Sequence, residues 1–134
     1  MPINGANNPS SPSGQILRYK VTGASINAVA DAATFSGLPA KWRLRKLTVY
    51  ETSTTLATSI ATVGAYTGAG ATGNALAALG LITGLTAAAK TADLTLAALA
   101  GTDYQTSANL YIRCGVAHGS AATISVAIEI EDLS

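Results

Sequence analysis

Two segments near the C-terminal end of the chain, Asn109–His118 and Thr123–Glu131, place apolar side chains at every second position. The residues that share one face are Leu110, Ile112, Cys114 and Val116 in the first segment and Ile124, Val126, Ile128 and Ile130 in the second. A period of two residues indicates β-strands with one buried face and is inconsistent with an amphipathic helix. Since the short link Gly119–Ala122 joins the two segments, the sequence predicts an antiparallel hairpin with one face open to solvent.

Similar patterns earlier in the chain predict further strands at Ile16–Thr22, Lys41–Thr52 and Ile60–Thr67. Within Lys41–Thr52 the apolar positions shift by one residue after Lys46, which predicts a β-bulge or a change of sheet. Short strands separated by Gly, Ser and Thr turns are typical of antiparallel sandwiches. The sequence therefore predicts an all-β fold, an antiparallel β-sandwich or jelly roll, over residues 15–134.

Three segments do not follow the strand pattern. Gly68–Asn74 is rich in glycine and predicts a loop, and Asn74 is a suitable N-cap for one helical turn at Ala75–Leu79. Asp93–Leu99 starts as a strand and can end in a helical turn. Residues 1–14 consist mainly of Pro, Asn, Ser and Gly, with Ile3 as the only sizeable apolar residue besides Met1. Such a segment predicts an extended N-terminal arm, which either frays or becomes ordered against a neighbouring subunit.

The chain carries unusually little charge. Charged residues make up 11% of the sequence, whereas about 25% is usual for soluble domains. A free monomer normally has a mixed, charged surface. The low charge and the shortage of large core side chains therefore favour a subunit of a larger assembly, with a homotrimer as the expected form.

Six of the eight basic residues lie in Arg18–Lys20 and Lys41–Lys46. Strand alternation places Trp42 in the core and turns the basic side chains outward. Three interpretations remain open for this basic stripe: a solvated strand face, a surface that docks on an acidic protein, or a contact with nucleic acid. We favour protein contact without direct nucleic-acid binding. The predicted interface residues are Ile3, Arg18, Lys20, Lys41, Arg43 and Arg45.

No set of residues in the sequence points to a reaction. Gly68–Gly73 matches the G-x-G-x-x-G pattern, but half of the chain precedes it and glycines interrupt the segment that follows. His118 has no nucleophile nearby in sequence and is expected on the surface, Cys114 is expected to be a buried, inert thiol, and Glu129 and Glu131 are expected on a solvated strand edge. One His and one Cys do not make a usual zinc site. The expectation is a protein without catalytic residues, cofactor or metal.

Apolar runs in the chain are shorter than a membrane span, and Ala75–Leu85, the closest, is interrupted by Gly80 and Gly84. Residues 1–14 lack the basic start and apolar centre of a signal peptide. The expectation is a soluble product of the cytoplasm.

The arm MPINGANNPSSPSG, the low charge and the strand-rich end LYIRCGVAHGSAATISVAIEIEDLS together resemble the head decoration, or cement, proteins of tailed bacteriophages. The resemblance implies a β-sandwich that trimerises at three-fold positions on the capsid exterior and clamps neighbouring major capsid subunits. It implies a virion protein made in the host cytoplasm, and it carries no catalytic residues.

A carbohydrate-binding jelly roll of a phage fibre or a secreted protein is the alternative. Such sites use exposed aromatic platforms, and this chain has Trp42 and five tyrosines. Several of the tyrosines occupy positions that alternation predicts to be buried.

Overall fold

The chain forms strands and loops without any helix among its described residues. The structure, a computed structural model, describes residues 14–54, 56, 59–82, 85, 90–97 and 104–134. Its strands are β1 (Gln15–Ser25), β2 (Ala30–Phe35), β3 (Trp42–Tyr50), β4 (Thr62–Gly68), β5 (Thr72–Leu81), β6 (Ala92–Asp93), β7 (Leu110–Val116) and β8 (Thr123–Asp132).

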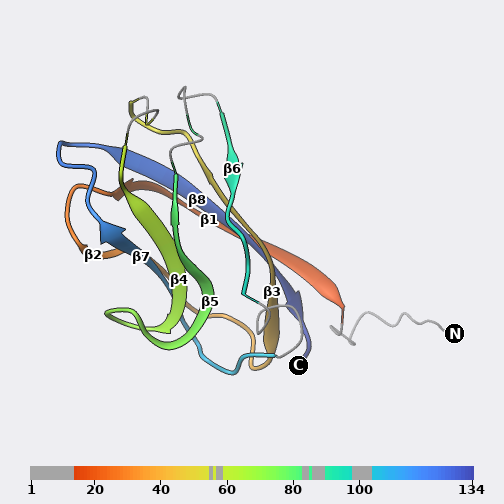
Figure 1. Cartoon of the computed structure of the whole chain (residues 1–134). Coiled ribbons are helices and arrows are strands. Elements are labelled where there is room, and N and C mark those ends of the chain that lie inside the picture. The colour runs from red at the N-terminus through yellow and green to blue at the C-terminus, as the bar shows by residue number, and fades with distance from the viewer. Residues whose placement is uncertain (1–13, 55, 57–58, 83–84, 86–89, 98–103) are drawn as a thin grey trace, which may run out of the picture.

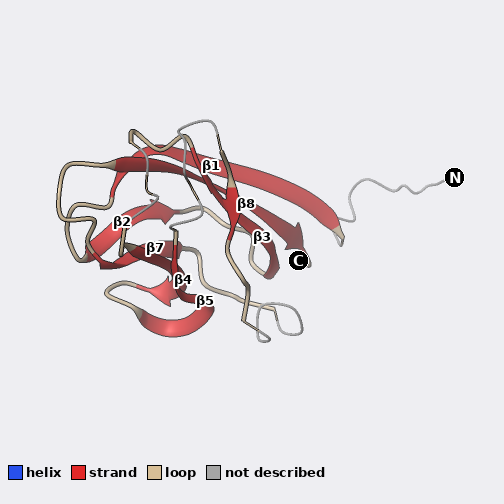
Figure 2. Cartoon of the chain, turned by 45° about the horizontal axis from the view of Figure 1, so that its top comes forward, coloured by secondary structure: helices blue, strands red, loops and turns tan. Residues whose placement is uncertain are grey.

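The strands make two antiparallel four-stranded sheets, in the orders β1-β8-β3-β6 and β2-β7-β4-β5, which pack face to face (Figures 1 and 2). Four of the pairings are nested: β1 with β8, β2 with β7, β3 with β6 and β4 with β5. A chain that folds back on itself in this way and then rolls into two sheets is a jelly roll. The predicted all-β, antiparallel sandwich is confirmed.

The predicted hairpin between the last two strands is wrong. β7 pairs with β2 and β4, whereas β8 pairs with β1 and β3 in the other sheet. The link Gly119–Ala122 thus carries the chain from one sheet to the other. The buried residues Ile112 and Ile128 belong to opposite layers of one core. The alternation of apolar residues shows which face of a strand is buried. It looks the same whether the next strand pairs with it in a hairpin or crosses to the other sheet.

The core lies between the two sheets and, among the described residues, consists mostly of buried Leu, Ile and Val side chains, with Trp42, Phe35 and five alanines. Trp42 is fully buried, as predicted, and its indole Nε1 donates a hydrogen bond to the Ser107 carbonyl oxygen at 2.8 Å. Ala61, Ala65 and Ala77 are also fully buried. These small side chains lie among the large ones and let the two layers pack closely, so the shortage of large core side chains expected from the sequence is not found.

Ala75–Leu79, where one helical turn was predicted, belongs instead to strand β5. Of the predicted loop Gly68–Asn74, only residues 69–71 form a turn, in which Gly70 and Ala71 have φ values of 70° and 63°, and the remaining residues belong to β4 and β5. Two consecutive residues with positive φ form the turn that suits a twisted hairpin. Pairing with β4 satisfies the backbone of this segment and overrides its local preference for helix. The hairpin curls at the end of its sheet (Figure 2).

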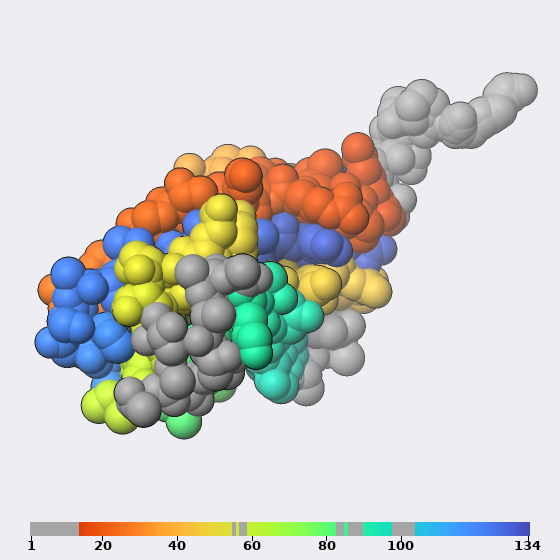
Figure 3. Space-filling view, turned by 90° about the horizontal axis from the view of Figure 1, so that it is seen from above, coloured from red at the N-terminus to blue at the C-terminus, as the bar shows by residue number. Residues whose placement is uncertain are grey.

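The phase shift predicted in the Lys41–Thr52 segment is a β-bulge. Opposite β8, Leu44 pairs with Ile130 and Lys46 with Glu129, so Arg45 is the extra residue. Of the segment Asp93–Leu99, only Asp93 lies in a described strand, β6, and residues 98 and 99 lie outside the described part. In the space-filling view, β1, β8 and β3 form adjacent red, blue and gold bands (Figure 3).

Candidate functional site

The outer face of the β1-β8-β3-β6 sheet holds most of the charge of this weakly charged chain. We call this surface the charged face. Its charged residues are the basic Arg18, Lys20, Arg43, Arg45 and Lys46 and the acidic Asp93, Glu129 and Glu131. The whole sequence has only eight basic and seven acidic residues. With five basic and three acidic residues, the charged face carries a net positive charge.

Local sequence explains why these side chains share one face. In β1, Leu17, Tyr19 and Val21 pack against the core, so Arg18 and Lys20 between them point outward. In β3, the bulge at Arg45 lets both Arg45 and Lys46 point outward. Trp42, Leu44, Leu47 and Val49 all remain in the core. With Trp42 and Leu44 in the core, a regular strand would have turned Lys46 inward and Leu47 outward.

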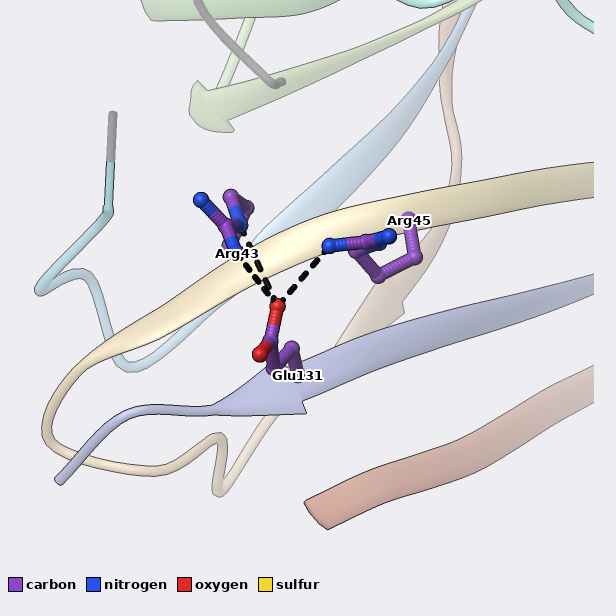
Figure 4. Close-up of polar contacts among 3 residues, drawn as sticks. All are labelled: Arg43, Arg45 and Glu131. Atoms are coloured by element: carbon purple, nitrogen blue, oxygen red, sulfur yellow. Dashed lines mark hydrogen bonds and ion pairs between the residues drawn. The ribbon is translucent and has the colours of Figure 1, made fainter. Parts of the chain in front are cut away.

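Glu131 lies near the C-terminal end of β8, beside two arginines of the neighbouring strand β3 (Figure 4). Its Oε1 atom accepts hydrogen bonds from Arg43 Nη2 at 2.6 Å and from Arg45 Nη1 at 2.9 Å. The Glu131 side chain is 16% exposed and that of Arg45 is 49% exposed. The hydrogen bond from Arg43, together with the positive charges of both arginines, lowers the pKa of Glu131, while desolvation opposes this shift. One carboxylate thus holds two guanidinium groups, and one positive charge remains.

The other ion pairs on the charged face are longer and more exposed. Arg18 Nε lies 3.4 Å from Glu129 Oε2, and Lys46 Nζ lies 3.8 Å from Asp93 Oδ2. Asp93 also accepts a hydrogen bond from Thr48 Oγ1 at 2.6 Å. Exposed pairs of this kind contribute about 0–1 kcal/mol each to stability. Their side chains can exchange an internal partner for an external one at little cost.

The structure brings four of the predicted interface residues onto this face. Arg18, Arg43 and Arg45 are ion-paired there, and Lys20 is exposed opposite Ala127. Lys41 lies just before β3, with its Nζ 5.4 Å from the centre of the Tyr104 ring, an arrangement typical of a cation–π contact. Ile3 lies outside the described residues.

Glu131 was missed as a site residue because the sequence placed it on a solvated strand edge. In fact, β8 lies between β1 and β3, so it is an inner strand. The available signal was the match between two outward acidic positions, Glu129 and Glu131, and the outward basic positions of Arg18 and Arg43. Their pairing joins residues that are 111 and 88 positions apart, and a single sequence does not reveal such long-range register.

His118 is half-buried rather than on an open surface, and its Nδ1 lies 2.8 Å from Ser59 Oγ. Ser59 is buried, and its Oγ also accepts the backbone N–H of Ala61 at 3.0 Å. A catalytic serine needs access to substrate and a histidine oriented by a third group. Among the described residues no carboxylate hydrogen-bonds to His118, so this pair is best understood as a tie between the β7–β8 link and the segment before β4.

Cys114 is fully buried, as predicted. Burial raises the pKa of its thiol, and the positive charge of Arg113 opposes this effect. The glycine-rich segment Gly68–Gly73 comprises the end of β4, a tight turn and the start of the antiparallel β5, so the strand–helix context of a dinucleotide site is missing. Instead, the backbone N–H of Gly70 donates to the Asp31 carboxylate at 3.0 Å, which fastens the hairpin tip to β2.

Over the described ranges, no group of three or more His, Cys, Asp or Glu side chains is placed to hold a metal ion. In the same part of the chain, no helix has the length and apolar character needed to cross a membrane.

Comparison of the chain with protein-family models, with curated protein sequences and with solved structures finds no match in any of the three.

Proposed function

We propose that this protein is a structural component of a bacteriophage virion that decorates the capsid exterior and stabilises it by bridging major capsid subunits. The observation that carries the proposal is the charged face. Eight of the fifteen charged residues of the chain lie on this one sheet surface, and five of its eight basic residues are among them. Such a surface fits an acidic patch on a protein partner.

Arg45 is the main contact residue in this proposal. Its guanidinium is half exposed and shares Glu131 with Arg43, so several of its five N–H donors remain available. Guanidinium groups bind carboxylates in a planar, two-point geometry that suits protein interfaces. Lys20 adds a second exposed charge from β1. Each contact is modest, but many identical copies on one capsid make the total stabilisation large.

Trimerisation at capsid three-fold positions belongs to the same proposal. The resemblance to decoration proteins implies it, and the low charge of the chain is consistent with burial of surface between subunits. The jelly roll itself does not decide function, because viral and carbohydrate-binding proteins both use it.

The test is binding to expanded phage heads. The double variant Lys20→Glu and Arg45→Glu should reduce occupancy on heads and make the residual binding less sensitive to salt, since fewer ion pairs form. Arg43 stays unchanged because its short contact with Glu131 is internal to the fold. Lys90→Glu is the matched control, since Lys90 is an exposed lysine outside the strands of the charged face.

Heads that carry the wild-type protein should release DNA at a higher temperature than heads without it. Equal heat resistance with and without the protein, or full occupancy by the double variant, would contradict the proposal.

A carbohydrate-binding module is the second candidate, and one pair of residues favours it. Tyr66 of β4 and Tyr111 of β7 are direct cross-strand neighbours whose rings point to the outer face of the second sheet. Both are half-buried rather than open, and the hairpin tip at Gly70 reaches Asp31 on the same sheet. If glycan binding is the function, Tyr111→Ala should abolish binding of a neutral oligosaccharide in calorimetry, while Tyr104→Ala should not.

A further inference from the structure

β1 differs from the other strands at the sheet edges because it has a long free side. β2 has six residues and a register shift after Asp31, and β6 has two residues. Along β5, the backbone N–H of Ala97 donates to the Leu76 carbonyl oxygen at 2.9 Å, and Asp93–Ala97 face the strand. By contrast, no backbone hydrogen bond between described residues reaches Gln15–Val21 from the side away from β8. We call Gln15–Val21 the β1 edge.

The backbone of the β1 edge has the regular form that strand addition needs. Each of its residues has one partner in β8, and the register shifts only beyond Val21. The segment, QILRYKV, contains neither proline nor glycine. Proline would remove a hydrogen-bond donor, and a bulge would twist the edge away. Since both are absent, an added strand can form an uninterrupted ladder along this segment.

The inner side of the β1 edge is incompletely covered. Leu17, Tyr19 and Val21 pack against the core but are only half-buried. Their neighbours Ile128 and Ile130 on β8 are fully buried. The start of β1 extends beyond the second sheet in two views (Figures 1 and 2), so that sheet leaves the start of the edge uncovered. Apolar side chains on an added strand would complete the burial of this surface, which is favourable.

The outer side of the β1 edge carries two cations but has only one acidic partner for them. Arg18 lies opposite Glu129, with its Nε atom 3.4 Å from Oε2, and its side chain is 72% exposed. Lys20 lies opposite Ala127 and makes no ion pair with any residue that the structure describes. Opposite charges at directly facing positions stabilise a strand pair. A strand with acidic residues facing Arg18 and Lys20 would therefore supply what β8 supplies only in part.

The same charges disfavour pairing of the β1 edge with a second copy of itself. Full antiparallel overlap of two β1 edges would place Arg18 opposite Arg18 and Ile16 opposite Lys20. Like charges at facing positions destabilise a strand pair, and charged side chains are a common protection of edge strands against self-association. The β1 edge thus discriminates in favour of a strand of opposite charge.

We infer that the β1 edge binds an extended segment of a partner protein in which acidic and apolar residues alternate. The backbone of that segment pairs with β1, its acidic side chains face Arg18 and Lys20, and its apolar side chains cover Leu17, Tyr19 and Val21. This strand pairing goes beyond the charge contact proposed above. The identity of the partner as a capsid subunit rests on the proposed function, whereas the pairing itself does not.

Titration of the isotope-labelled protein with three short peptides tests the pairing. The matching peptide, Ser-Val-Glu-Ile-Glu-Val-Ser with blocked ends, has the alternation that fits residues 17–21. One control peptide has Lys in place of both Glu residues. The other has Pro in place of Ile, which keeps the charge but removes a backbone donor. The matching peptide should shift the backbone amide signals of Gln15–Val21 in NMR spectra and slow their hydrogen exchange, and neither control should do so.

Three results would overturn the inference. The first is the absence of shifts in Gln15–Val21 with the matching peptide up to millimolar concentration. The second is an equal effect of the proline peptide, which would mean attraction between charges without strand pairing. The third is an equal effect of the lysine peptide, which would mean that the edge does not select acidic residues.

A charge exchange at Lys20 provides the second readout. Lys20→Glu should weaken binding of the matching peptide about fivefold, because an attractive cross-strand pair becomes a repulsive one, and should bind the lysine peptide instead. Lys90→Glu, at an exposed lysine outside the sheet, is the control and should bind the matching peptide as the wild type does. Unchanged affinity in Lys20→Glu would contradict the pairing. These measurements use no phage heads, so this inference and the proposed function can fail separately.

Discussion

Arg43 and Glu131 are 88 residues apart in sequence, yet the Arg43 Nη2 atom lies 2.6 Å from the Glu131 carboxylate. The contact joins the start of β3 to the end of β8 on the charged face, and Glu131 also binds Arg45. One residue therefore orders two cations of the proposed interface. It also links the stability of the fold to the charge of that surface.

This link predicts a pH dependence. The pKa of Glu131 in the folded protein is lowered from its ordinary value of 4.5, chiefly by the hydrogen bond from Arg43, so the unfolded chain binds this proton more readily than the folded one. The stabilisation is fully present well above pH 4.5 and is lost as the pH falls through the lowered pKa. Urea unfolding measured between pH 7 and pH 3 should show that the free energy of unfolding declines below about pH 5. The decline should be smaller in Glu131→Gln. If the free energy of unfolding depends on pH in the same way for the wild type and for Glu131→Gln, Glu131 does not have this role.

Two glycines of the β4–β5 hairpin should respond differently to alanine. At Gly64 a Cβ atom would meet backbone atoms of β5 at 2.7 Å and 3.0 Å, whereas at Gly80 the nearest atoms are 3.8 Å and 3.9 Å away. Gly64→Ala should destabilise the fold by about 1–3 kcal/mol, because the sheet must shift to relieve the overlap. Gly80→Ala should be close to neutral. Urea denaturation of the matched pair tests this, and equal midpoints would argue against the close crossing of β5 over β4.

The indole of Trp42 should matter for its hydrogen bond as well as its size. Trp42→Phe removes the donor to the Ser107 carbonyl, and an unpaired carbonyl in a partly buried position costs about 1–3 kcal/mol. Far-UV circular dichroism is the appropriate probe for unfolding, because Trp42 is the only tryptophan. Tyr104→Phe, at a side chain 54% exposed, is the control and should unfold with the wild-type midpoint.

Cys114 should react with thiol reagents only after unfolding. Its side chain is fully buried, and burial raises the pKa of the thiol, so little reactive thiolate forms near neutral pH. The expected result is slow labelling of the native protein by a disulfide reagent and rapid labelling in denaturant. Rapid labelling of the native protein would show that β7 opens readily.

Alternation alone determined much of the fold. It identified the strands around Trp42 and Ile128, the buried side of each, and the outward direction of Arg18, Lys20 and Arg43. The one-residue phase shift after Lys46 correctly indicated the bulge at Arg45. These features are local, because the side chains of a strand point alternately to its two faces whatever its partner is.

Only the tertiary structure decided which strands pair. The chain after His118 crosses to the other sheet instead of forming a hairpin, and Ala75–Leu79 extends as part of β5 because β4 offers it a partner. The position of Glu131 between Arg43 and Arg45 follows from the same pairing. Partners in a jelly roll come from distant parts of the chain, and their register depends on how all the buried faces fit into one core. A local pattern therefore shows that a strand has a buried face, while the tertiary structure decides which strands pair with it and which residues pack against it.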